Sequence, residues 1–223
     1  MIDGLHLSGP LSGIFARWYE KDIRVYSGGP ALFLDRDGVI VEDTHYLSSP
    51  GDISFIPGVA EALRSLRDLN IPVIVVTNQA GIGKGYYGWD AFAAVQKHIN
   101  DYVRDQGGFI SGCVACPYHP EGKNPYRHGN HPFRKPNPGM ILWALKSANI
   151  DRSGSWLAGD KLSDLQAGAL AGLAGLAHVS TGQGKKEAGI AESWSGKRTD
   201  VIFVDSLKEV VMRFIKMIKG LRD

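Results

Sequence analysis

The feature that most constrains the fold is the motif Asp-Arg-Asp-Gly at residues 35–38, which lies between two apolar runs. The run before it, residues 31–34, reads Ala-Leu-Phe-Leu, and the run after it, residues 39–41, reads Val-Ile-Val. Two carboxylates therefore follow directly on a segment that is apolar enough to form a buried strand. Ligands of open α/β sheets bind at the carboxyl ends of the strands, so we expect Asp35 and Asp37 at such an edge.

Apolar runs alternate with helical patterns along the rest of the chain, which predicts an α/β fold. The expected strands cover residues 31–34, 72–76, 111–115, 155–159, 175–179 and 201–204. The expected helices cover residues 58–69, 89–106, 138–148, 163–171 and 206–220. Continuous apolar strands favour a mainly parallel sheet with both faces covered. We therefore predict a doubly wound, Rossmann-like sheet.

The length of 223 residues suits one α/β domain with a modest insertion. We expect residues 31–223 to form this domain and residues 1–30 to be an N-terminal extension, in which residues 15–19 form a helical turn. Residues 116–137 are rich in proline and histidine and almost free of aliphatic side chains. This composition predicts an irregular loop excursion at the same edge of the sheet.

The composition predicts a cytoplasmic protein and gives no sign of a nucleic-acid or membrane partner. The formal net charge is only +2, too small to indicate either partner by itself. No apolar stretch approaches the roughly 18 residues of a membrane span, and we expect no signal peptide. Two cysteines cannot build a disulfide framework. The oligomeric state is left open.

Three further segments follow expected strands and carry polar groups. Residues 77–85 read Thr-Asn-Gln-Ala-Gly-Ile-Gly-Lys-Gly, which offers hydrogen-bond donors to an anion, although glycines also suit a plain strand-to-helix loop. Arg134 and Lys135 precede an expected helix, whose N-terminus favours anions, although two surface charges are the simpler alternative. Asp160 ends another strand and suits Mg²⁺ or a helix cap.

The common placement of these residues is more informative than any one of them. A nucleophile, an acid/base group, anion donors, a cation and a metal ligand are all expected at the carboxyl ends of strands in one sheet. These are the parts that phosphoryl transfer to an aspartate requires.

With these motifs in this order, the chain resembles the haloacid dehalogenase-like phosphatase superfamily. Residues 77–82, 116–122, 134–140 and 159–164 further resemble the D,D-heptose 1,7-bisphosphate phosphatases and the related histidinol-phosphate phosphatases. The resemblance spans roughly residues 31–181. It implies a Mg²⁺-dependent hydrolase of small phosphate esters, with D-glycero-D-manno-heptose 1,7-bisphosphate as the expected substrate. Histidinol phosphate or another small phosphomonoester is the alternative.

The resemblance also implies a role for each matching residue. Asp35 would be the nucleophile, and Asp37 would protonate the leaving oxygen and then activate water. Mg²⁺ would be held by the carboxylates of Asp35 and Asp160 and the carbonyl of Asp37. Phosphate and substrate contacts are expected from Thr77, Asn78, Gln79, Arg134, Lys135 and Lys161. The short interval from Asp35 to Thr77 leaves no room for a large cap domain.

One departure from the family concerns zinc. The four positions of the family's zinc site are here Cys116, Tyr118, His131 and Phe133. Tyrosine and phenylalanine cannot replace cysteine or histidine as zinc ligands, so we expect no zinc, with Tyr118 and Phe133 packed on each other instead. The alternative is a different zinc cluster of Cys113, Cys116, His119, His128 and His131.

Two other classes of protein would use the same kinds of residue. A phospho-receiver signalling domain also combines carboxylates, Mg²⁺, a threonine and a lysine, but its phosphorylated aspartate follows a different strand from its acidic pair. Here Asp35 and Asp37 follow one strand, which favours an enzyme. A catalytically idle binding relative is the other alternative, but no motif residue is missing.

Overall fold

The computed structural model describes residues 5–6, 13–19, 28–196 and 198–220. These residues form one eight-stranded sheet in the order β1-β2-β5-β4-β3-β6-β7-β8. The strands are β1 (Leu5–His6), β2 (Phe15–Trp18), β3 (Leu32–Leu34), β4 (Val73–Asn78), β5 (Gly112–Cys116), β6 (Trp156–Gly159), β7 (Gly175–Val179) and β8 (Val201–Val204). All pairings among β3 to β8 are parallel, and β1 and β2 join antiparallel at one edge.

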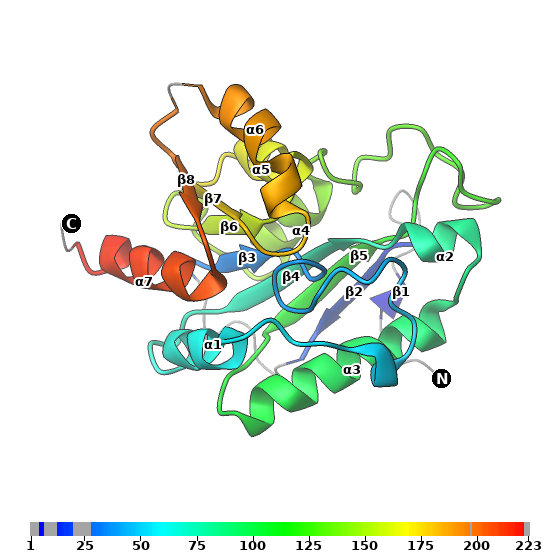
Figure 1. Cartoon of the computed structure of the whole chain (residues 1–223), viewed down its shortest axis with the longest axis horizontal. Coiled ribbons are helices and arrows are strands. Elements are labelled where there is room, and N and C mark those ends of the chain that lie inside the picture. The colour runs from blue at the N-terminus through cyan, green and yellow to red at the C-terminus, as the bar shows by residue number, and fades with distance from the viewer. Residues whose placement is uncertain (1–4, 7–12, 20–27, 197, 221–223) are drawn as a thin grey trace.

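Helices cover both faces of the sheet (Figure 1). They are α1 (Val59–Arg67), α2 (Ala80–Lys84), α3 (Trp89–Asp105), α4 (Gly139–Ser147), α5 (Leu162–Ala171), α6 (Gly184–Ser195) and α7 (Leu207–Ile218). One core cluster joins Leu32 and Leu34 to α1, α3 and α7. The other joins Phe33 to α4, α5 and α6. The predicted doubly wound, mainly parallel α/β fold is therefore confirmed.

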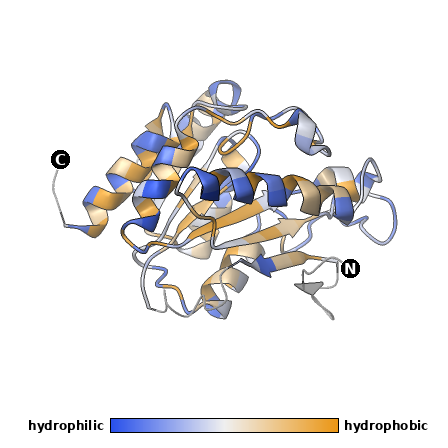
Figure 2. Cartoon of the chain, turned by 90° about the horizontal axis from the view of Figure 1, so that it is seen from below, coloured by the Kyte–Doolittle hydropathy of each residue, from blue (hydrophilic) through white to orange (hydrophobic). Residues whose placement is uncertain are grey.

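Burial explains why the central strands are continuously apolar. Alternate residues of a strand point to opposite faces, and β3 is covered on both, so all three of its residues are fully buried. In Figure 2 the central strands are mostly orange, whereas the helices over them alternate between orange and blue. Each helix therefore needs only one apolar stripe. In α7 the buried residues that form this stripe recur at intervals of three and four residues.

The predicted absence of a large cap domain is also confirmed. Between β3 and β4 the chain forms only the short 3₁₀ helix Pro50–Asp52 and α1. Residues 117–138 contain no helix or strand, apart from one isolated bridge between His119 and Arg127. No folded lid over the edge of the sheet is present in the described part of the chain. Nor is any helix within it long and apolar enough to cross a membrane.

The helical turn predicted at residues 15–19 is wrong, because residues 15–18 form β2. Phe15 pairs with Ala115 of β5, and its ring stacks at 5.7 Å on Trp89 and meets Phe92 edge-on at 5.2 Å. Pairing and packing with distant residues override the local pattern. The rest of the predicted extension lies partly outside the described residues, and the domain boundary at residue 30 stays a prediction.

Two helices were not expected from the sequence. Residues 80–84 form α2 despite two glycines, and residues 184–195 form α6. The buried residues of α6 are only Gly184, Ala191 and Ser195, so it carries no apolar stripe for a periodicity argument to detect.

Candidate active site

The register of the sheet brings the predicted polar residues to one edge. Leu34 is aligned with Val75 of β4 and Ala158 of β6, so the carboxyl ends of these parallel strands lie at the same edge of the sheet. β3 is the point where the strand order reverses, with β4 on one side and β6 on the other. A pocket of about 200 Å³ opens there. Its lining includes Asp35, Asp37, Thr77, Gln79, Lys135 and Lys161.

Asp35 and Lys135 form the floor of this pocket. Asp35 Oδ1 accepts a hydrogen bond from the Arg36 backbone N at 2.7 Å and pairs with Lys135 Nζ at 3.0 Å. Lys135 is only 3% exposed, and it also pairs with Asp164 Oδ1 at 2.6 Å and donates to the Val76 carbonyl at 2.8 Å. Burial lowers the pKa of Lys135, but Asp164 and Asp35 outweigh it, so the net shift is upward. The ammonium group therefore stays charged.

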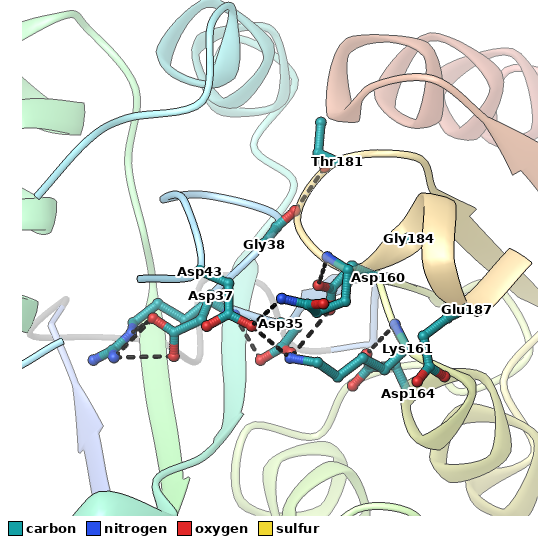
Figure 3. A network of polar contacts seen from close by, with 12 residues as sticks. Asp35, Asp37, Gly38, Asp43, Asp160, Lys161, Asp164, Thr181, Gly184 and Glu187 are labelled. Atoms are coloured by element: carbon teal, nitrogen blue, oxygen red, sulfur yellow. Dashed lines mark hydrogen bonds and ion pairs between the residues drawn. The ribbon is translucent and has the colours of Figure 1, made fainter. Parts of the chain in front are cut away.

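Three carboxylates converge beside this lysine. Asp35, Asp160 and Asp164 lie side by side (Figure 3), with one oxygen atom of each within 4.8 Å of the others. No other such group of metal-ligating side chains occurs among the described residues. Burial, reinforced by repulsion from Asp35 and Asp164, raises the pKa of Asp160 to about 8. Asp160 Oδ1 is buried and has no hydrogen-bond partner in the described structure. A divalent cation fits these oxygen donors and would relieve their repulsion.

Backbone groups hold Asp160 in place. Its Oδ2 accepts from the Gln183 backbone N at 2.8 Å, in the loop after β7. Thr181 Oγ1 in that loop donates to the Gly38 carbonyl at 2.6 Å (Figure 3). Gly38 has a φ of +88°, and a Cβ there would lie 2.1 Å from Asp160 Oδ2. Only glycine allows this close approach between the first motif and Asp160.

Asp37 points to a different group of side chains. Its Oδ1 accepts from Arg36 Nε at 3.1 Å and Nη2 at 2.9 Å, while its Oδ2 accepts from Nη2 at 3.0 Å. Gln79 Nε2 donates to the same Oδ2 at 3.0 Å and to Thr77 Oγ1 at 2.9 Å. The guanidinium of Arg36 is itself buried, 5.3 Å from the ring of Phe92. The Asp37 carboxylate is thus fixed at the wall of the pocket.

The other residues predicted to contact phosphate or substrate have different positions relative to the pocket. The amide of Asn78 is committed to the Lys135 backbone, donating to its carbonyl at 3.0 Å and accepting from its N at 3.1 Å. Lys161 lines the pocket and pairs with Asp43 Oδ2 at 3.1 Å. Arg134 donates to the Tyr118 carbonyl at 3.0 Å and is not among the residues that line the pocket. Asn78 therefore positions Lys135.

Several residues of the site were not predicted from the sequence. They are Arg36, Asp43, Tyr46, Tyr87, Thr181 and Gln183. Asp164 ends the motif at residues 159–164, which predicted no role for it, and it pairs with Lys135. Thr181 and Gln183 follow the strand expected at 175–179, so the carboxyl-end rule could have found them. Tyr46 and Tyr87 lie in loops with no comparable signal.

The alternative zinc cluster is not assembled. Cys113 and Cys116 are three residues apart on β5, so their side chains point to opposite faces of the sheet and belong to different core clusters. They cannot form a half-site for one ion. His131 stacks on Tyr118 with 3.8 Å between ring centroids, and its ring also lies 6.2 Å from that of Phe133. The expected contact of Tyr118 with Phe133 stays a prediction. The absence of zinc itself stays a prediction.

A mainly parallel α/β sheet with Asp35, Lys135 and Asp160 at one carboxyl edge defines the class of haloacid dehalogenase-like hydrolases. The family model described as HAD-hydrolase-like matches residues 132–210. A protein of Mesorhizobium loti described as a HAD-like phosphatase has a similar crystal structure, with a TM-score of 0.82, 35% identity and 98% of each chain covered.

Two relatives and a second crystal structure define the family more closely. A D-glycero-β-D-manno-heptose-1,7-bisphosphate 7-phosphatase of Pasteurella multocida is 35% identical over 86% of this chain and 98% of its own length. One of Mesorhizobium japonicum is 49% identical over 65% of this chain and 67% of its own length. This chain belongs to the family of D-glycero-D-manno-heptose-1,7-bisphosphate 7-phosphatases. The D,D-heptose 1,7-bisphosphate phosphatase of B. bronchiseptica, complexed with magnesium and phosphate, has a TM-score of 0.72 at 27% identity, covering 84% and 99% of the two chains.

Proposed function

We propose that this protein is a Mg²⁺-dependent phosphatase that removes the 7-phosphate of D-glycero-D-manno-heptose 1,7-bisphosphate through an aspartyl-phosphate. The observation that carries the proposal is the convergence of Asp35, Asp160 and Asp164 on one side of a buried lysine. Two relatives that bear this enzyme's name support the choice of substrate.

Asp35 is the proposed nucleophile. Its Oδ1 is held by the Arg36 backbone N and by Lys135, so we assign the attack on phosphorus to Oδ2. A new bond forms between Oδ2 and phosphorus while the bond from phosphorus to the sugar oxygen breaks. Lys135 and the hydroxyl of Thr77 would hold the phosphoryl oxygens, because a charged ammonium and an oriented O–H stabilise the charge of the transition state.

Asp37 is the proposed acid and base. A sugar alkoxide is a poor leaving group, so Asp37 donates a proton to the departing oxygen. In the second half-reaction Asp37 accepts a proton from water, which attacks phosphorus and releases Asp35 and inorganic phosphate. The carboxylates of Asp35 and Asp160, with the Asp37 carbonyl, would hold Mg²⁺. When bound there, Mg²⁺ supplies positive charge that offsets repulsion between the nucleophile and the phosphate.

The open pocket suits a substrate that extends beyond one phosphoester, since no folded lid closes over it in the described part of the chain. A receiver domain is disfavoured because Asp35 and Asp37 both follow β3. This placement puts Asp37 beside the proposed nucleophile as an acid/base group that can hydrolyse the intermediate. A cytoplasmic location and the absence of nucleic-acid or membrane partners remain predictions.

The test is phosphate release from the heptose bisphosphate, from histidinol phosphate and from nucleoside monophosphates, each with Mg²⁺. We expect kcat/KM for the heptose bisphosphate to exceed the others by at least about 100-fold, since a site built for a substrate's polar groups rejects analogues without them. A higher kcat/KM for histidinol phosphate or a nucleotide would show that the heptose bisphosphate is not the preferred substrate. No release from any ester would refute the phosphatase itself.

A further inference from the structure

A tyrosine that no catalytic motif includes lines the pocket of the proposed site. Tyr87 lies between α2 and α3, and its hydroxyl donates to Gln79 Oε1 at 2.6 Å. Its ring occupies the space that a side chain at residue 81 would fill, because a Cβ on Gly81 would lie 2.3 Å from a ring carbon of Tyr87. The local sequence thus makes room for this ring beside the pocket.

The Tyr87 hydroxyl decides which way the Gln79 amide faces. A glutamine amide has one acceptor and one donor end. With Oε1 facing Tyr87, Nε2 donates to both Thr77 Oγ1 and Asp37 Oδ2, at 2.9 and 3.0 Å. The flipped amide would turn Oε1 toward the Asp37 carboxylate, and oxygen would face oxygen. Gln79 is only 2% exposed, so water cannot easily compensate for a lost partner.

Tyr87 remains a hydrogen-bond donor throughout the ordinary pH range. Burial raises the pKa of its phenol to about 12, and the nearby Arg36 opposes the shift only in part. A phenol that stays protonated has one O–H to donate, and the oxygen of Gln79 receives it.

The same bonds set the direction of the Thr77 hydroxyl. A threonine hydroxyl has a single proton, and the oxygen of Thr77 already accepts from Gln79. Its proton is therefore free to point into the pocket, toward the place of a phosphoryl oxygen. Gln79 also holds Oδ2 of Asp37, the carboxylate that would meet the leaving group. One amide thus orients both a phosphate donor and the proposed acid.

We infer that Tyr87 is a positioning residue of the proposed phosphatase: its hydroxyl fixes the Gln79 amide, which in turn directs the Thr77 proton to the phosphoryl group and holds Asp37 beside the leaving oxygen. The inference rests on the proposed function, and it assigns Tyr87 no contact with substrate.

The test variant is Tyr87→Phe, which removes one oxygen and keeps the ring. We expect kcat on the heptose bisphosphate to fall roughly 10-fold, the size of effect that a lost buried hydrogen bond produces. The loss on p-nitrophenyl phosphate should be about threefold or less, because nitrophenolate leaves without a proton. The inhibition constant of inorganic phosphate should rise several-fold, since Thr77 is no longer held. The matched control is Tyr86→Phe, an exposed neighbour, which should leave all three quantities unchanged.

A second variant separates positioning from a purely structural role. Gln79→Met keeps the volume and removes the amide, so adding Tyr87→Phe to it should cause no further loss. Equal losses from Tyr87→Phe on both esters, unchanged kinetics, or additive losses in the double variant would each overturn the inference. A wild-type protein inactive on both esters would instead overturn the proposed function.

Discussion

Charged side chains of the site, most of them buried, form mutually dependent sets. Lys135 has two carboxylate partners, Asp35 and Asp164, and a backbone carbonyl. Arg36 and Asp37 form a second set, joined by a two-pronged ion pair. Breaking a buried pair leaves a charge without compensation, which typically costs about 3–5 kcal/mol. Each residue of the site is therefore constrained by its partners as well as by the reaction.

The acid role of Asp37 gives a prediction about leaving groups. Asp37→Asn keeps the shape of the side chain but removes the transferable proton. We expect turnover of a sugar phosphate to fall about 10²–10⁴-fold, and turnover of an aryl phosphate to fall much less. Steady-state kinetics on both esters provide the comparison. Equal losses would argue that Asp37 serves the fold or the metal and does not act as the acid.

Residues that follow apolar strands were predictable as a set, from their common placement. Asp35, Thr77 and Asp160 each come directly after such a run, and the sheet brings them to one edge. Asp43 and Tyr87 were not predictable, because they reach the pocket from loops and are recognised only by their partners, Lys161 and Gln79. Contacts between loops that are distant in sequence leave no local pattern.

Among the secondary-structure elements, β2 contradicts its sequence pattern most clearly. It lies between β1 and β5 in the sheet, and Phe15 packs on Trp89 and Phe92 of α3. Helices such as α7, with a regular apolar stripe, were predicted well. Elements whose stability comes from distant partners, such as β2 and α6, were not.

Truncation of Phe15 tests whether β2 is an integral part of the fold. We expect Phe15→Ala to lower the free energy of unfolding by about 3–5 kcal/mol, the usual effect of removing a buried aromatic ring. Leu170→Ala, at a 64% exposed position of α5, should change it by about 0.5 kcal/mol or less. Urea unfolding measures both variants. Similar values for the two would show that residues 15–18 do not stabilise the sheet.

The loop at residues 117–138 should be ordered without zinc. Tyr118 stacks on His131, and burial, aided by His128, lowers the pKa of His131 to about 4, so the ring is neutral near pH 7. The prolines of this loop restrict its unfolded state, so less conformational entropy is lost when the loop becomes ordered. We expect metal analysis of the purified protein to find well under one zinc per chain, and a zinc-selective chelator to leave Tm unchanged. Stoichiometric zinc and a lower Tm on chelation would contradict this prediction.

The whole molecule brings three like charges together where its sheet reverses strand order. Lys135 pairs with Asp35 and Asp164, but burial and the remaining repulsion still raise the pKa of Asp160, so the arrangement is unfavourable without a metal ion. The proposed metal should therefore stabilise the fold as well as assist the reaction, because a ligand that binds only the folded state adds to its stability.

The stabilisation by Mg²⁺ should depend on pH. Asp160 has a folded-state pKa of about 8 against an ordinary value of 3.8, so the folded protein binds its proton more tightly than the unfolded chain does. Stability of the metal-free protein should then fall as pH rises from about 4 to 8. Since Mg²⁺ needs the ionised carboxylate, the rise in Tm on adding Mg²⁺ should be larger at pH 8 than at pH 6. Asp160→Asn should abolish the rise, and an equal rise in that variant would place the metal elsewhere.

The central claim is that Asp35 is the nucleophile of a phosphatase. The measurement is turnover of the heptose bisphosphate by Asp35→Asn with saturating Mg²⁺, compared with wild type at equal concentrations of folded protein. Asparagine can keep the hydrogen bond from the Arg36 backbone N, and Lys135 keeps Asp164 as a charged partner, so the variant should still fold. We predict a loss of activity on the order of a thousandfold or more, because no other side chain can form the covalent intermediate. Activity near the wild-type level would contradict the account.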